Sequence, residues 1–101
     1  MNMLKGILSE SKEYYIDAKN KIEKKLLSLP HGSLKERQIA GKKYYYLQSR
    51  AGNKVVHKYL GKAKPESLIK QLFVRKALKA ELKKVNEALR MLKRAEGRKN
   101  G

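Results

Sequence analysis

The chain lacks cysteine altogether and has only two histidines among its 101 residues. Without cysteine there is no disulfide framework and no thiolate metal site. His31 and His57 lie far apart in the sequence, and neither has an Asp or Cys cluster around it. The sequence therefore predicts no metal and no cofactor. The absence of cysteine also fits a reducing compartment, and we expect the protein to be cytoplasmic.

Long apolar runs and catalytic motifs are missing as well. No stretch approaches the roughly 20 apolar residues that span a bilayer, and the short apolar start of the chain is followed at once by acids, unlike a secretory signal. No Ser/His/Asp grouping, paired-carboxylate motif, phosphate loop or metal-ligand spacing occurs. An enzyme needs convergent groups with tuned pKa values. We therefore expect no enzymatic activity, no catalytic residues and no membrane partner.

Acidic residues are scarce beside the basic ones. Lys and Arg number 26 against 9 Asp and Glu, which gives a formal net charge of +17. The excess is uneven, because residues 1–32 carry six basic and four acidic side chains and most of the surplus follows them. A compact body with this charge repels itself unless an anionic partner or salt neutralises it. The basic footprint favours nucleic acid as that partner, with an acidic protein or an anionic membrane as alternatives.

Two amphipathic helices are predicted, one near each end of the chain. Residues 3–29 form the first, because apolar side chains recur at steps of three, four or seven residues, and Pro30 ends it. Its stripe comprises Leu4, Leu8, Tyr15, Ala18, Ile22, Leu26 and Leu29. Residues 65–96 form the second, with Pro65 suited to the first position and a basic tail over residues 97–101. Its stripe comprises Leu68, Leu72, Leu78, Leu82, Val85, Leu89 and Leu92.

The second helix is longer than a small sheet can cover. At ~1.5 Å per residue it extends about 46 Å. The spacing from Leu78 to Leu92 alternates between four and three residues, as in a coiled-coil-like helix seam. We expect the distal half of this helix to pack on the first helix, on a second copy in a homodimer through residues 65–96, or on a partner.

Three short strands separate the helices. They are expected at residues 33–39, 42–49 and 54–60, with a tight turn at Ala40-Gly41 and a second turn over residues 50–53. The predicted fold class is α+β, with the order helix, three-stranded antiparallel meander, helix. The length suits a single small domain over residues 1–101.

Alternation along the strands assigns side chains to two faces, with Ile39 opposite Lys42 and Ser49 opposite Lys54. One face gathers Lys35, Arg37, Ile39, Tyr44, Tyr46, Gln48, Val55, His57 and Tyr59. The other gathers Leu34, Glu36, Gln38, Lys43, Tyr45, Leu47, Val56, Lys58 and Leu60. This second, aliphatic face is expected to meet the helices; the alternative is that it is the exposed face. The tyrosines of the first face are either a core, as strand tyrosines often are, or a platform on which bases stack.

The candidate nucleic-acid-binding residues lie in two groups. The sheet contributes Lys35, Arg37, Lys42, Lys43, Tyr44, Tyr46, Arg50, Lys54, His57 and Lys58. The second helix contributes a row at helical spacing, Lys76, Lys79, Lys83, Arg90 and Arg94, interrupted by Glu87 and well away from the leucine stripe. Such a row matches a phosphate backbone. The alternatives are a solvated face or, less in keeping with an apolar side that lacks Trp, a helix lying on an anionic membrane.

One segment resembles a known family. It contains Gly32-Ser33-Leu34, Gly41-Lys42, Tyr45-Tyr46-Leu47, Gly52, Lys54-Val55 and Lys58-Tyr59-Leu60-Gly61-Lys62, followed by a Lys/Glu-rich helix. This succession is similar to a small prokaryotic domain-of-unknown-function family and extends over about the last two thirds of the chain. The resemblance supports the fold and implies no chemistry. The Lys-Tyr-Leu-Gly-Lys ending also resembles N-terminal segments of some transposases, which is a fold-level analogy.

Two functional hypotheses follow. The first is a non-enzymatic protein that grips the phosphate backbone of DNA or RNA, or of a ribonucleoprotein, with sheet cations and a basic helix flank. The second is an interaction protein of phage or mobile-element type, an accessory factor or inhibitor. It would dock through its helical seam on a nucleic-acid-handling machine or an acidic protein.

Overall fold

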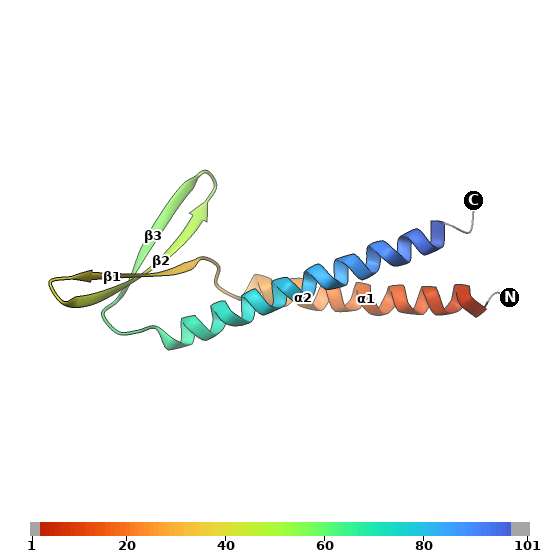
Figure 1. Ribbon diagram of the computed structural model, residues 1–101, viewed down its shortest axis with the longest axis horizontal. Coiled ribbons are helices and arrows are strands. Elements are labelled where there is room, and N and C mark those ends of the chain that lie inside the picture. The colour runs from red at the N-terminus through yellow and green to blue at the C-terminus, as the bar shows by residue number, and fades with distance from the viewer. Residues whose placement is uncertain (1–2, 98–101) are drawn as a thin grey trace. The chain divides into compact units, whose positions relative to one another are not determined.

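The computed structural model describes residues 3–97 and contains a helix, three strands and a second helix (Figure 1). These elements are α1 (Met3–Ser28), β1 (Ser33–Ile39), β2 (Lys42–Ala51), β3 (Lys54–Gly61) and α2 (Glu66–Gly97). The predicted α+β class and element order are confirmed. Apart from Gly97, the predicted basic tail lies outside the described residues.

The chain divides into two compact units. The helical unit consists of α1 and the part of α2 from Ala77 onward. The sheet unit spans Leu29–Lys76 and contains the three strands and the start of α2.

Prolines set the helix boundaries near the predicted positions. Leu29 precedes Pro30, and the proline ring disfavours helical dihedrals in the residue before it, so α1 ends at Ser28. Pro65 lies just before α2 rather than at its first position. Its carbonyl accepts a 3.0 Å hydrogen bond from the backbone N–H of Ile69, as the residue that caps a helix does.

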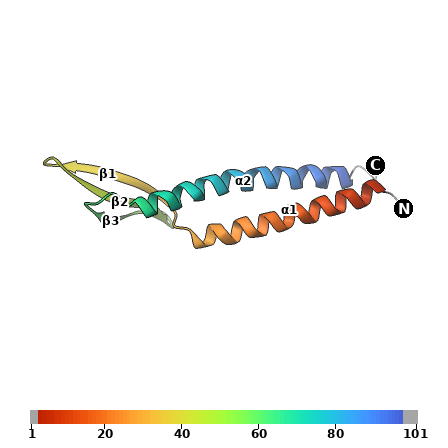
Figure 2. The same cartoon turned by 90° about the horizontal axis from the view of Figure 1, so that it is seen from below.

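In the helical unit, α1 and the distal part of α2 lie side by side and antiparallel (Figure 2). Lys12 Nζ lies 3.3 Å from Glu96 Oε2, which joins the first half of α1 to the end of α2. Val85, at the centre of the predicted seam, is buried with 5% of its surface exposed. The seam leucines Leu78, Leu82, Leu89 and Leu92 are half-buried. The distal half of α2 therefore packs on α1, one of the partners that its length allowed.

Leu4 departs from the predicted stripe of α1. It is 57% exposed, whereas Leu8, Tyr15, Ala18, Ile22 and Leu26 are half-buried. The exposed part of the predicted stripe is therefore its start, in the first turn of α1.

The sheet has the order β1-β2-β3 with antiparallel pairing throughout. Ile39 pairs with Lys42 as predicted. The predicted pairing of Ser49 with Lys54 is wrong, because Ser49 pairs with Val56 and Ala51 pairs with Lys54. The second turn is shorter than expected, so β2 continues to Ala51. The register differs by two residues, and an even shift keeps every paired side chain on its predicted face, whereas Leu60 has no partner in the ladder.

Backbone dihedrals explain both turns. Ala40 and Gly41 have φ values of 52° and 79°, and two positive values define a type I′ hairpin turn. In the second turn Gly52 has φ 65° whereas Asn53 is not in the positive region, as in a type II′ turn. A two-residue connection therefore suffices at each end of β2.

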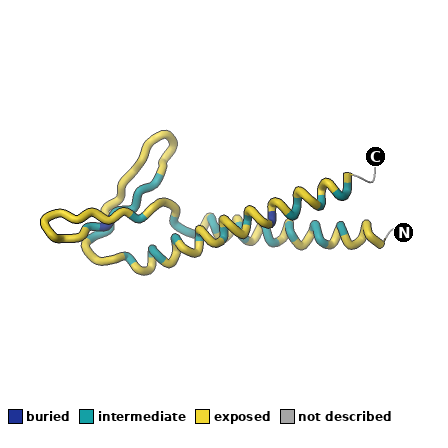
Figure 3. Tube along the Cα trace, viewed as in Figure 1, coloured by how far each residue is buried: buried dark blue, intermediate teal, exposed yellow. Residues whose placement is uncertain are grey.

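Burial is slight across the described residues. Only Tyr45 in β2, at 8%, and Val85 in α2, at 5%, fall in the buried class (Figure 3). Gly32 marks one close backbone approach in the sheet unit, since a Cβ there would lie 2.6 Å from the Gln48 carbonyl oxygen. Most side chains of both units are therefore at least partly accessible.

Candidate functional site

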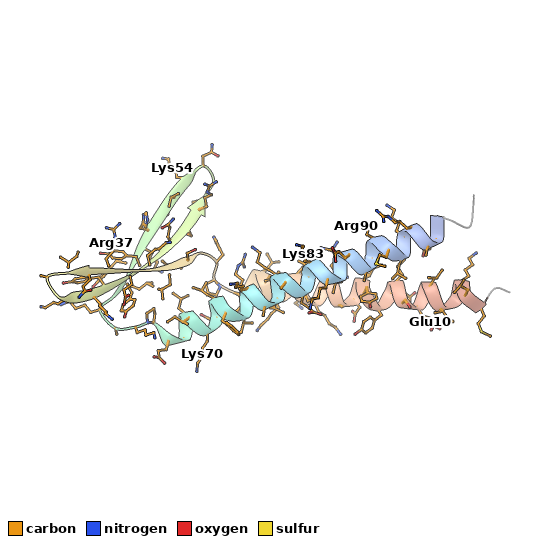
Figure 4. All side chains as sticks on the ribbon, viewed as in Figure 1. Glu10, Arg37, Lys54, Lys70, Lys83 and Arg90 are labelled. Atoms are coloured by element: carbon orange, nitrogen blue, oxygen red, sulfur yellow. The ribbon has the colours of Figure 1, made fainter. Side chains whose placement is uncertain are left out.

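One side of the sheet, which we call the tyrosine face, has no acidic side chain. Residues that pair across antiparallel strands share a face. The register therefore assigns to it Ser33, Lys35, Arg37, Ile39, Lys42, Tyr44, Tyr46, Gln48, Arg50, Val55, His57 and Tyr59. Lys35, Arg37, Lys42 and Arg50 give this face its positive charge, and Figure 4 labels Arg37 on the sheet.

Three tyrosines form a cluster on this face. The Tyr59 ring lies 5.3 Å from the ring of its cross-strand partner Tyr46, centroid to centroid, and 6.4 Å from that of Tyr44. The rings are tilted by 52° and 43°, within the range that aromatic pairs adopt. Tyr44 and Tyr46 are half-buried, whereas Tyr59 is 52% exposed. The cluster therefore has two covered rings and one open ring.

Two cations lie against the covered rings. The Arg37 guanidinium carbon is 5.5 Å from the Tyr46 ring centroid, and Lys62 Nζ is 5.9 Å from the Tyr44 ring centroid. Both distances are in the range of cation–π contacts.

Lys62 was not among the predicted site residues. A bulge brings it into the cluster, since Tyr46 pairs with Tyr59 while Tyr45 pairs with Gly61. Leu60 is the extra residue. The only sequence signal for the contact of Lys62 with Tyr44 is a glycine and a lysine directly after the strand that contains Tyr59. That pattern does not predict a bulge.

The opposite face of the sheet holds its buried residue. The Tyr45 hydroxyl donates a 3.2 Å hydrogen bond to Glu36 Oε1, and Lys43 Nζ lies 3.6 Å from the same oxygen. Leu34 and Leu47 are half-buried on this face. The only acid of the sheet is therefore engaged on the side away from the tyrosine cluster.

This arrangement separates the predicted sheet residues. Lys35, Arg37, Lys42, Tyr44, Tyr46, Arg50 and His57 share the tyrosine face. Lys43, Lys54 and Lys58 lie on the opposite face, because their strand partners are Gln38, Ala51 and Leu47. Three of the ten residues therefore do not contribute to a common surface with the tyrosines.

The basic row of α2 is a second candidate surface, within the helical unit. A groove of about 320 Å³ is lined by Leu26, Lys79, Leu82, Lys83, Asn86, Glu87 and Arg90. Lys83 and Arg90 are labelled on α2 in Figure 4. Arg94 continues the row one turn later and is exposed, whereas Lys76 belongs to the sheet unit. Four of the five predicted helical cations thus share one unit.

Few of these cations are neutralised within the protein. Ion pairs join Lys12 with Glu96, Lys21 with Asp17 and Lys43 with Glu36 among residues 3–97. Of the predicted binding residues, only Lys43 has an acidic partner there. The remaining cations keep their charge available for an external anion.

The described residues offer little for other chemistries. No three His, Cys, Asp or Glu side chains among them come together as metal ligands do. Across the same residues, neither helix has an apolar stretch long enough to cross a bilayer.

Comparison with known proteins gives one match. A family model described as a domain of unknown function, DUF6788, matches residues 12–70. That range takes in most of α1, the whole sheet and the first turn of α2. No curated protein and no solved structure matches the chain.

Proposed function

Because the chain belongs to the DUF6788 family, whose description assigns it no function, we propose a role from its own surfaces: a non-enzymatic protein that binds nucleic acid. The observation that carries this proposal is the acid-free tyrosine face, which Lys35, Arg37, Lys42 and Arg50 share with a cluster of tyrosines. A polyanion with flat bases matches both components of that surface.

The binding mode is chiefly a grip on the phosphate backbone. Cations that meet phosphates release condensed counterions, and this release drives association without reading sequence. The groove lined by Lys79, Lys83 and Arg90 supplies a second set of cations of the same kind. Asn86 in that groove has an amide that can donate to a phosphate oxygen.

The salt dependence of binding tests this proposal. If four sheet cations neutralise four phosphates of a single strand, affinity falls about 50-fold between 50 and 200 mM salt. Fluorescence anisotropy with labelled single-stranded DNA, duplex DNA and RNA of one length measures it. Equal affinity at both salt concentrations would contradict binding through the phosphate backbone.

A second candidate function rests on the apolar surface of the helical unit. Ile7, Tyr14 and Met91 are 53%, 69% and 69% exposed, and Leu27 is 89% exposed. Docking surfaces are contiguous apolar patches, and Ile7 and Tyr14, seven residues apart, lie on one side of α1. They favour an accessory or inhibitor protein that docks on a nucleic-acid-handling machine or an acidic protein, or that pairs with a second copy through α2.

Purification separates the two candidates. A backbone-binding protein of charge +17 carries nucleic acid through a low-salt purification, which raises its absorbance at 260 nm relative to 280 nm. Protein that is free of nucleic acid at low salt, together with capture by an acidic protein surface, would favour the docking role.

A further inference from the structure

We propose that the tyrosine face binds single strands, with one unpaired base stacked on Tyr59 and the adjoining phosphates held by Arg37 and Lys62. This inference rests on the proposed nucleic-acid function and specifies its substrate class. The protein would then prefer an unpaired strand over a duplex, and the Tyr59 ring would be responsible for this preference.

Exposure singles out Tyr59 within the cluster. Its side chain is 52% exposed, and its neighbours Tyr46 and Tyr44 are tilted against it rather than stacked parallel to it. Arg37 lies over the Tyr46 ring and Lys62 over the Tyr44 ring. Tyr46 and Tyr44 each have a cation against the ring, and Tyr59 is the most exposed of the three tyrosines, so its ring is the one that an incoming base can meet.

The charges around the ring suit a strand that crosses the cluster. Arg37 and Lys62 lie against Tyr46 and Tyr44, the two β2 tyrosines whose rings neighbour the Tyr59 ring. A nucleotide stacked on Tyr59 has a phosphate on its 5′ side and another on its 3′ side. Arg37 and Lys62 each contact a ring next to Tyr59, so the proposal assigns these two cations to the phosphates that adjoin the stacked base.

Stacking on a protein ring requires an unpaired base. In a duplex the ring faces are stacked on neighbouring base pairs, and the protein meets only edges and backbone. Single strands expose their base faces, and proteins that bind them combine a basic surface with aromatic side chains. The tyrosine face has both features and no acid to repel the strand.

The experiment compares three labelled ligands of about 15 nucleotides, the upper end of single-strand site sizes. They are oligo-dT, an abasic oligomer with the same phosphates, and a duplex. For the unmodified protein we expect oligo-dT to bind between about 5-fold and 150-fold more tightly than the abasic oligomer, the range for one stacked base. Equal binding of these two would overturn the inference without any variant, so a misfolded variant cannot hide the result.

Variants then locate the stacked base. Tyr59→Leu is expected to remove most of the preference for oligo-dT over the abasic oligomer and to leave duplex binding unchanged. Tyr59→Phe keeps a ring and is expected to bind oligo-dT within about twofold of the unmodified protein, because stacking needs the π-face and not the hydroxyl. Tyr14→Leu is the matched control, since Tyr14 is also exposed, at 69%, and also contacts another tyrosine.

A charge variant separates this inference from the proposed function. Lys42→Gln combined with Arg50→Gln removes two cations of the face that touch none of the three rings, and it should weaken binding to all three ligands. If that variant weakens binding while Tyr59→Leu retains the preference for oligo-dT, the backbone grip stands and stacking on Tyr59 is wrong. If the protein binds none of the ligands at low salt, the proposed function falls and this inference falls with it.

The absence of tryptophan gives an independent readout. All intrinsic fluorescence comes from the six tyrosines, and a base stacked on a tyrosine quenches it. Titration with oligo-dT should quench the unmodified protein more than Tyr59→Leu, whereas the abasic oligomer should leave both unquenched. Equal quenching by the two oligomers would contradict base stacking.

Discussion

Neighbouring residues of β2 have opposite roles. Tyr45 is 8% exposed, and its hydroxyl donates a hydrogen bond to the Glu36 carboxylate. Tyr46, the next residue, lies under Arg37 on the tyrosine face. Strand alternation alone separates the two. The only acid of the sheet is used in folding contacts, and this leaves the other face free of negative charge.

Ala40 is the residue where a single substitution should stabilise the sheet. Its φ of 52° lies in the left-handed region, which costs a residue with a Cβ about 1–2 kcal/mol. Ala40→Gly removes that penalty. The glycine also raises the conformational entropy of the unfolded chain, which lowers the unfolding free energy by about 0.4–1 kcal/mol. We expect a net gain of up to about 1.6 kcal/mol in unfolding free energy, measured by chemical denaturation.

Ala51→Gly is the matched control for that substitution. Ala51 lies in β2 and does not have a positive φ, so the same change offers no relief there. It is expected to cost about 0.5–1 kcal/mol, because glycine weakens a strand. If both substitutions destabilise the protein alike, the strain assigned to Ala40 is absent in solution.

At the scale of elements, α2 has two different surfaces on two sides. Its seam, with Val85 buried, packs on α1. Its basic row, offset around the helix, lines the groove with Lys79, Lys83 and Arg90. Because side chains three and four residues apart lie on one side of a helix, a single sequence can encode a packing surface and a charged surface without conflict.

The groove cations can be tested as a unit. Lys79→Gln with Lys83→Gln should weaken binding to every nucleic acid alike and should lower the slope of log affinity against log salt by about 1.4–1.8, for two lost phosphate contacts. Anisotropy titrations over a salt series give this slope. Circular dichroism checks that the helices remain intact.

Lys5→Gln with Lys84→Gln provides the comparison. It removes the same charge from helix positions that do not line the groove, so we expect a smaller change in slope. Equal changes in both double variants would show that total charge matters and the position of the row does not.

For the whole molecule, charge opposes compactness. The net charge is +17, while only Tyr45 and Val85 are buried among the described residues. Little apolar burial is therefore available within the chain to offset repulsion between its cations. An anionic partner would supply stabilisation that the isolated chain lacks.

Thermal stability should consequently rise with salt. Increasing ionic strength from 0.01 to 0.15 M shortens the screening length from about 30 to about 8 Å. If screening raises the unfolding free energy by about 1 kcal/mol, the melting temperature rises by about 4–8 °C. Circular dichroism melts measure this, with a non-ionic solute at equal osmolality as the control. A melting temperature that falls or stays constant with salt would show that repulsion does not limit stability.

Local features of the sequence determined most of the fold. Apolar periodicity located both helices, prolines set their ends near Ser28 and Glu66, and turn residues separated the three strands. Strand alternation placed Tyr44, Tyr46 and Tyr59 on one face, and an error of two residues in the second turn left that assignment unchanged because the alternation has a period of two. These features depend on residues close together in the chain.

Tertiary structure decided which residues meet. The bulge before Gly61 brings Lys62 to Tyr44, the hydroxyl of Tyr45 finds Glu36, and Val85 becomes the buried centre of the helix pair. It also showed that Lys43, Lys54 and Lys58 lie apart from the tyrosine cluster and that Tyr59 is its open ring. These contacts depend on the register between strands and on packing between segments that are distant in the sequence. Periodicity within one segment carries no information about either.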